Sequence, residues 1–209
     1  MKFLRTIHQY RYLIYQMTRR EIFQRYQGSA LGFAWSFLNP LLMLTVYTFV
    51  FSVIFKSRWS GAEVEESRAD FAITLFAGLI IFNTFSEIVN RAPDLVLSNV
   101  GFVKKVVFPL EILPIISSGA VLFHSFISLL VLMGVQILFN SHIPITIIYT
   151  PLIILPLLLI GLGLSWFLAA LTVYIRDVSH ITGIITTMLM FLSAVFFPVS
   201  ALPENLKAI

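Results

Sequence analysis

Long runs without a charged side chain constrain this chain more than any other feature. From Gly28 to Phe55 no Asp, Glu, Lys or Arg occurs, whereas the nine residues before this run contain four of them. A membrane-spanning helix needs about 20 predominantly apolar residues, and an Arg at its centre would cost about 2.5–3.5 kcal/mol. The stretch Arg19–Pro40 therefore predicts the point where the chain inserts into a membrane, with a cationic collar beside it.

Composition extends this interpretation to the whole chain. Of 209 residues, 58% are hydrophobic and 11% charged, and the mean hydropathy is +0.93, whereas soluble domains carry about 25% charged residues. Lipid cannot satisfy the edges of an open sheet, so we predict an all-α, polytopic helical membrane protein. The net charge of +4 does not indicate nucleic-acid binding, because the basic residues cluster beside predicted spans. The absence of Cys excludes disulfides and thiolate metal sites.

The predicted organisation is an amphipathic interface segment, 1–30, followed by a transmembrane domain, 31–209. Five spans are expected, at about 33–55, 71–90, 110–139, 147–174 and 178–198. The first long apolar run starts too late for a cleavable signal peptide. Ten Lys and Arg fall in 1–30, 91–109 and 176, against four on the other side. This bias predicts a cytoplasmic N-terminus.

The polar and small residues inside the predicted spans are interpreted as structural. Glu87 precedes Arg91 by four residues, which favours a structural ion pair over a proton relay. His124 is expected to be a packing residue rather than a ligand. Small residues predict close helix packing at Ser117–Ala120 and again at Gly161, Gly163 and Ser165.

Two clusters leave alternatives open. The basic residues of 1–30 act either as an anchor alone or also as ligands of an anionic headgroup, because Arg forks suit phosphate oxygens. Aromatic residues recur along one face of the first span, which indicates either helix packing or a ring-lined path for a sugar chain; they include Phe33, Phe37, Tyr47, Phe51 and Phe55.

Residues 91–109 are too polar to span a membrane. Pro93-Asp94 can start a short helix and Gly101 can end it, so a small cytoplasmic helix is expected. The chain has no Gly-x-x-x-x-Gly-Lys phosphate loop and no paired carboxylates in mid-span. Energy for transport would therefore come from another chain, received at 94–108.

Four motifs carry a family resemblance: RREIFQRYQGSALGFAWSFLNPLL (19–42), VKKVVFPLEILP (103–114), YIRDVSHI (174–181) and FFPVSALPENLK (196–207). Together, in this order, they resemble the membrane subunit of polysaccharide ABC exporters, the ABC-2-type permeases that export O-antigen, capsule or teichoic acid.

This resemblance implies a homodimer in the bacterial inner membrane that works with two copies of a separate ATPase. ATP and Mg²⁺ would bind that partner, and no cofactor or metal would bind this chain. Residues 199–209 would begin extracytoplasmic gate helices. A sixth span is expected in the family, so we expect a truncated chain.

The resemblance also implies three sets of site residues. The lipid pyrophosphate would enter beside Arg19, Arg20, Arg25 and Tyr26. The first and fifth spans would line the conduit with Phe37, Tyr47, Phe51, Phe55, Phe191, Phe196 and Phe197. A coupling helix at about 94–108, with the turn near 176, would contact the ATPase through Asp94, Asn99, Phe102, Lys104, Lys105, Arg176 and Asp177.

The expected function is thus a non-enzymatic permease for a lipid-linked polysaccharide. Two alternatives remain: an ABC-2 permease for a drug or small lipid, and a membrane enzyme acting on lipid-linked sugars. The enzyme is disfavoured because its candidate acids, Asp94, Glu111 and Asp177, are scattered singly.

Overall fold

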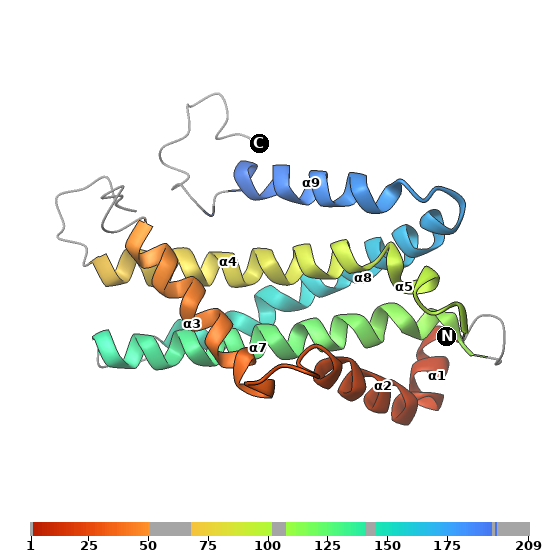
Figure 1. Ribbon diagram of the computed structural model, residues 1–209, viewed down its shortest axis with the longest axis horizontal. Helices are drawn as coiled ribbons and strands as arrows, with labels where there is room; N and C mark the ends of the chain where they lie inside the picture. The colour runs from red at the N-terminus through yellow and green to blue at the C-terminus, as the bar shows by residue number, and fades with distance from the viewer. Residues whose placement is uncertain (1, 51–67, 102–107, 141–144, 194, 196–209) are drawn as a thin grey trace.

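The chain is a bundle of helices (Figure 1). The computed structural model describes residues 2–50, 68–101, 108–140, 145–193 and 195, and the regular elements in these ranges are all helical. The all-α prediction is therefore confirmed. The elements are α1 (Lys2–Gln9), α2 (Arg11–Gln24), η1 (Gly32–Ala34), α3 (Trp35–Tyr47), α4 (Arg68–Arg91), α5 (Asp94–Leu97), η3 (Leu110–Ile112), α7 (Leu113–Asn140), η4 (Ile145–Tyr149), α8 (Thr150–Tyr174) and α9 (Val178–Leu192).

Four helical stretches among the described residues are long and apolar enough to cross a membrane. They are Gly32–Val50, Ala72–Arg91, Leu110–Leu138 and Ile147–Tyr174, and α9 is a shorter apolar helix of 15 residues. The protein is thus a multi-pass membrane protein. The far ends of the first and fifth predicted spans, and the predicted gate segment 199–209, lie outside the described residues.

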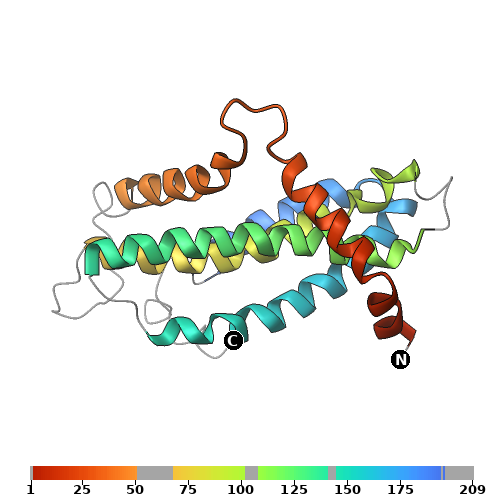
Figure 2. The same ribbon diagram turned by 90° about the horizontal axis from the view of Figure 1, so that it is seen from below.

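Helix α4 is the central element of the bundle. It packs against α3, α7, α8 and α9, and Figures 1 and 2 show these helices arranged around it. The end of α4, α5, the start of α7 and the turn between α8 and α9 lie at one end of the bundle, together with α1 (Figure 1). The segments that the charge count places on one side of the membrane are therefore neighbours in space.

The first span packs into the bundle through part of its predicted aromatic face. Leu44 of α3 is buried with Phe76 and Ile80 of α4 and Leu132 of α7, and Tyr47 packs against this cluster. This part of the face thus makes helix contacts within the chain, as the packing interpretation expects.

Small residues bring α8 close to α4. Gly161, Ser165, Ala169 and Thr172 form a buried stripe along α8, and a Cβ added at Gly161 would lie 3.2 Å from Cγ2 of Ile88. The prediction that Gly163 shares this face is wrong: it has open space around it. Two residues along a helix turn it by about 200°, which carries Gly163 away from α4.

This difference between two nearby glycines gives a stability prediction. We expect Gly161→Leu to destabilise the fold by about 1–3 kcal/mol, because the side chain overpacks the contact with Ile88. Gly163→Leu is the matched control and should not destabilise the fold, because a Cβ added there meets no neighbour and Leu favours helix over Gly. Thermal unfolding of the purified protein in one detergent would measure both. Equal unfolding temperatures for the two variants would show that α8 does not pack on α4 through Gly161.

The second predicted small-residue patch joins α7 to the N-terminal helix. Ser117, Ser118 and Ala120 are buried, and a Cβ at Gly119 would lie 3.0 Å from Cγ2 of Thr18. Close packing at this patch is confirmed. Helix α2 is therefore held against the bundle at α7.

Candidate functional site

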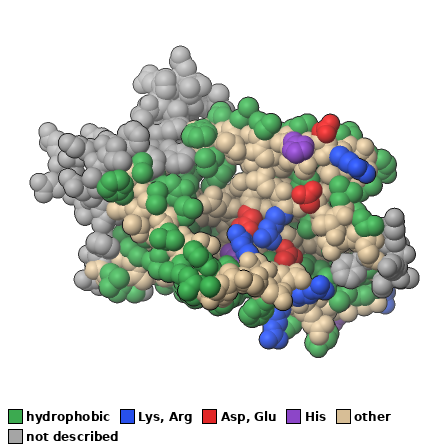
Figure 3. Space-filling view, in the orientation of Figure 1, with side chains coloured by type: hydrophobic (Ala, Val, Ile, Leu, Met, Phe, Trp, Pro, Cys, Tyr) green, Lys and Arg blue, Asp and Glu red, His purple; other side chains and the backbone are tan. Residues whose placement is uncertain are grey.

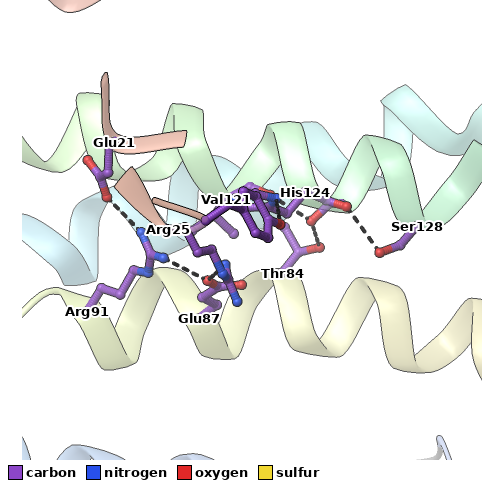
Figure 4. A network of polar contacts seen from close by, with 10 residues as sticks. Glu21, Arg25, Thr84, Glu87, Arg91, Val121, His124 and Ser128 are labelled. Atoms are coloured by element: carbon purple, nitrogen blue, oxygen red, sulfur yellow. Dashed lines mark hydrogen bonds and ion pairs between the residues drawn. The ribbon is translucent and has the colours of Figure 1, made fainter. Parts of the chain in front are cut away.

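An ion-pair network ties α2 to α4 (Figure 4). Arg25 Nη1 lies 2.6 Å from Glu87 Oε1, and Arg91 Nη1 lies 2.6 Å from Glu21 Oε1. Arg91 Nη2 also lies 3.1 Å from Glu87 Oε1, which confirms the predicted pair. Sequence reasoning missed the other two contacts, since their partners stand 62 and 70 residues apart.

Beside this network, the segment after α2 also contacts α7. The Tyr26 hydroxyl is 3.1 Å from Nδ1 of His124, and the two rings meet edge to face. Burial raises the pKa of the Tyr26 phenol, with smaller opposing effects of Arg25 and Glu87, so the phenol remains protonated and available as a donor. His124 is thus held by a neighbour, as expected for a packing residue.

The turn that follows α2 places these groups. Gly28 has φ of 86° and Gly32 of 49°, backbone conformations that glycine adopts at little cost. Ser29 Oγ accepts a hydrogen bond of 2.9 Å from the Gly32 amide. The chain can therefore reverse from α2 into α3 while Arg25 and Tyr26 still face the bundle.

A polar cavity of about 640 Å³ opens beside the network, between the end of α2 and helices α3, α4 and α7. Its wall contains Arg25, Glu87 and Arg91 at the charged end and uncharged polar groups such as Asn39, Asn83 and Ser128 elsewhere. Figure 3 shows side chains of both charge signs side by side in a hollow on this face.

The four predicted headgroup residues fall into two pairs. Arg19 and Arg20 are exposed, and Arg19 lies 5.8 Å from the centroid of the Phe23 ring. Arg25 is instead paired with Glu87, and Tyr26 is buried. Tyr26 lines both the cavity and a shallow groove that contains Arg20.

The predicted conduit residues are only partly described. Phe37 is exposed on α3, Tyr47 lines the polar cavity and Phe191 is exposed on α9. Helices α3 and α9 both pack against α4. The remaining candidates lie outside the described residues: Phe51, Phe55, Phe196 and Phe197.

The predicted coupling segment differs from one helix over 94–108. Helix α5 ends at Leu97, a turn follows at Ser98 and Asn99, and helix resumes at Val100 and Gly101. Ser98 Oγ donates to the Asp94 carbonyl at 2.6 Å and Asn99 Nδ2 donates to the Leu95 carbonyl at 2.8 Å. Such side-chain bonds to nearby backbone compete with continued helix.

The surroundings of α5 place the other coupling candidates. Asp94 is exposed at the start of α5, and Arg176 and Asp177 are exposed in the turn between α8 and α9. Helix α5 packs against α8 and α7. Phe102, Lys104 and Lys105 lie outside the described residues. Within the described ranges, no three His, Asp or Glu side chains are grouped to hold a metal.

The fold and this helix-to-bundle junction define a multi-pass helical membrane protein with a polar cavity lined in part by residues of its candidate spans. Residues 12–209 match the ABC-2 type transporter family, and the chain belongs to that family. The resemblance drawn from the four motifs is thereby confirmed at the level of the family.

Named relatives cover almost the whole chain. It is 28% identical over 205 residues to the "O-antigen export system permease protein RfbA" of Myxococcus xanthus. The matched region covers 98% of this chain and 75% of the relative. It is 20% identical over 194 residues to a protein of the same description from Klebsiella pneumoniae, and this matched region covers 92% of this chain and 71% of the relative.

Proposed function

We propose that this chain is the permease subunit of an ATP-driven exporter, which moves a lipid-linked, O-antigen-like polysaccharide across the bacterial inner membrane. Membership of the ABC-2 type transporter family supports the transport role, and the descriptions of the relatives support the substrate class. In this proposal two copies of the chain form the membrane part, and two ATPase subunits bind ATP and Mg²⁺.

One structural observation carries the proposal. The exposed residues Asp94, Arg176 and Asp177 belong to segments at the same end of the bundle as α1 (Figure 1). This grouping supports a single cytoplasmic face, with the N-terminus on that side, where an ATPase would dock. A docking surface next to the N-terminal helices would couple ATP hydrolysis to α2, the helix that meets the substrate in this proposal.

The substrate headgroup is assigned to the exposed arginines of α2. Arg19 and Arg20 stand free of the Glu21–Arg25–Glu87–Arg91 network among the described residues. Their guanidinium forks can meet pyrophosphate oxygens in two-point contacts. Arg25 would first have to leave Glu87, so we give it a supporting part.

The test uses the permease with its ATPase in lipid nanodiscs, with ATPase activity measured against added lipid-linked glycan. We expect stimulation in the native complex. In the Arg19→Ala/Arg20→Ala variant, the glycan concentration for half-maximal stimulation should rise about tenfold or more, because hydrogen bonds to charged groups are lost.

Arg11→Ala is the matched control, since Arg11 is exposed at the first position of the same helix. It should behave like the native chain. Stimulation by small amphiphiles and none by the glycan would instead indicate a drug or small-lipid permease. Equal glycan response in the Arg19/Arg20 variant would remove these two residues from headgroup binding.

A further inference from the structure

The polar cavity beside α4 is lined by polar side chains from three candidate membrane spans. Asn39 and Asn83 belong to the spans Gly32–Val50 and Ala72–Arg91, and Ser128 to Leu110–Leu138. Polar groups inside a bilayer are costly unless they meet polar partners. A cavity walled by hydroxyls and amides from three spans therefore needs a polar occupant.

Two side-chain amides in the wall indicate the chemistry of that occupant. Asn39 and Asn83 are both exposed in the cavity wall, and neither has a hydrogen-bond partner within the part of the chain that the structure describes. An Asn side chain offers two donor hydrogens and an acceptor oxygen. A group with adjacent hydroxyls can satisfy both functions at once.

The charges at the mouth disfavour a free anion there. Arg25 and Arg91 are already paired with Glu87 and Glu21 at 2.6–3.1 Å, so two positive charges face two negative ones. The cluster leaves no excess positive charge for a phosphate inside the cavity. A neutral hydroxylated group fits this balance better.

The cavity also suits a sugar in size and shape. Its volume of about 640 Å³ falls within the range of about 300–1,000 Å³ typical of small-molecule sites. Tyr26 and Tyr47 contribute aromatic rings to the wall, against which the apolar C–H face of a sugar ring can pack. Tyr26 is shared with the groove of Arg20, so the two sites adjoin.

We propose that the cavity between α3, α4 and α7 binds a lipid-attached sugar. The identity of that lipid rests on the proposed function: the sugar is the first residue after the pyrophosphate, whose oxygens are assigned there to Arg19 and Arg20, and Arg20 lines the groove that adjoins the cavity. The cavity thereby recognises the sugar next to the lipid before the polymer is moved.

The experiment titrates the permease–ATPase complex in nanodiscs free of sugar detergents, and counts bound probe by native mass spectrometry. The probes are a polyprenyl pyrophosphate carrying one hexose, the same lipid without the hexose, and a monoglucosyl diacylglycerol. In the Asn39→Leu/Asn83→Leu variant we expect the Kd of the hexose-bearing polyprenyl lipid to rise about tenfold, with the sugar-free lipid changed by less than about twofold.

Thr45→Val is the matched control on α3, because Thr45 is exposed and its hydroxyl bonds to the Leu41 carbonyl of its own helix. It should bind all probes like the native chain. If the double variant fails to assemble, Ser128→Ala removes one cavity hydroxyl that bonds only within its helix in the described part of the chain, and the Kd should rise in the same direction.

The outcomes separate the two proposals. Unchanged binding of the hexose lipid, or equal weakening of the sugar-free lipid, would overturn the sugar site while leaving the exporter proposal intact. Amide-dependent binding of the monoglucosyl diacylglycerol alone would support a sugar site filled by a resident glycolipid. Failure of every glycan lipid to stimulate the ATPase would count against the exporter itself.

Discussion

Glu87→Gln is expected to loosen α2 from the bundle and to reduce export strongly. Glu87 is the only carboxylate in the described chain that contacts both Arg25 and Arg91, at 2.6 Å and 3.1 Å. Its loss leaves two neighbouring guanidinium groups with Glu21 alone. The side chains are 29–40% exposed, so the cost lies between that of surface and buried pairs, at about 1–3 kcal/mol.

Hydrogen exchange of the α2 backbone would measure this loosening, with faster exchange expected over Arg11–Gln24. Glu111→Gln is the control, because Glu111 is exposed and forms no ion pair among the described residues. Adding Arg25→Leu to Glu87→Gln removes the uncompensated charge and should restore part of the protection. Unchanged exchange in Glu87→Gln would mean that the remaining contacts, the Arg91–Glu21 pair and the packing of Thr18 on Gly119, are enough to hold the helix.

Loss of the ATPase is expected when the exposed surface around α5 is changed. Asp94 is exposed at the start of this helix, and Val100, three residues beyond its end, is 41% exposed. Asp94→Arg together with Val100→Asp reverses one charge and places another at an exposed apolar position. At an interface, such a combination costs several times more than the loss of a rim contact.

Co-purification of the ATPase with tagged permease measures this effect, and we expect it to fall below detection. Ile145→Asp is the control: it makes the same kind of change at an exposed residue that begins η4, just before α8. It should retain the ATPase. Normal recovery of the ATPase with the α5 variant would place the docking surface elsewhere.

The features of this protein that could be predicted came from local sequence patterns. Hydropathy and charge predicted helices through a membrane, because lipid rejects charged groups wherever they stand in the chain. Small residues at Ser117–Ala120 predicted a close helix contact, and spacing by four predicted the Glu87–Arg91 pair. The same reasoning failed at Gly163, where residue type was right but the helical face was not.

The candidate site was less predictable because its contacts join distant parts of the chain. The headgroup set of Arg19, Arg20, Arg25 and Tyr26 looked uniform in sequence. In the structure Arg19 and Arg20 form no ion pair with the described residues, whereas Arg25 meets Glu87 and Tyr26 meets His124. Polar residues of α3, α4 and α7 were single features in separate spans until the bundle brought them around one cavity.

The sequence by itself determined the solvent of each segment: apolar runs must lie in lipid, and the basic stretches must stay outside it. Tertiary structure alone decided which polar groups meet. A helix pattern specifies a face but not the partner for that face, and the partners of Arg25, Arg91 and Tyr26 stand 62–98 residues away. Packing of α2 on α7, and of α4 on its neighbours, selected them.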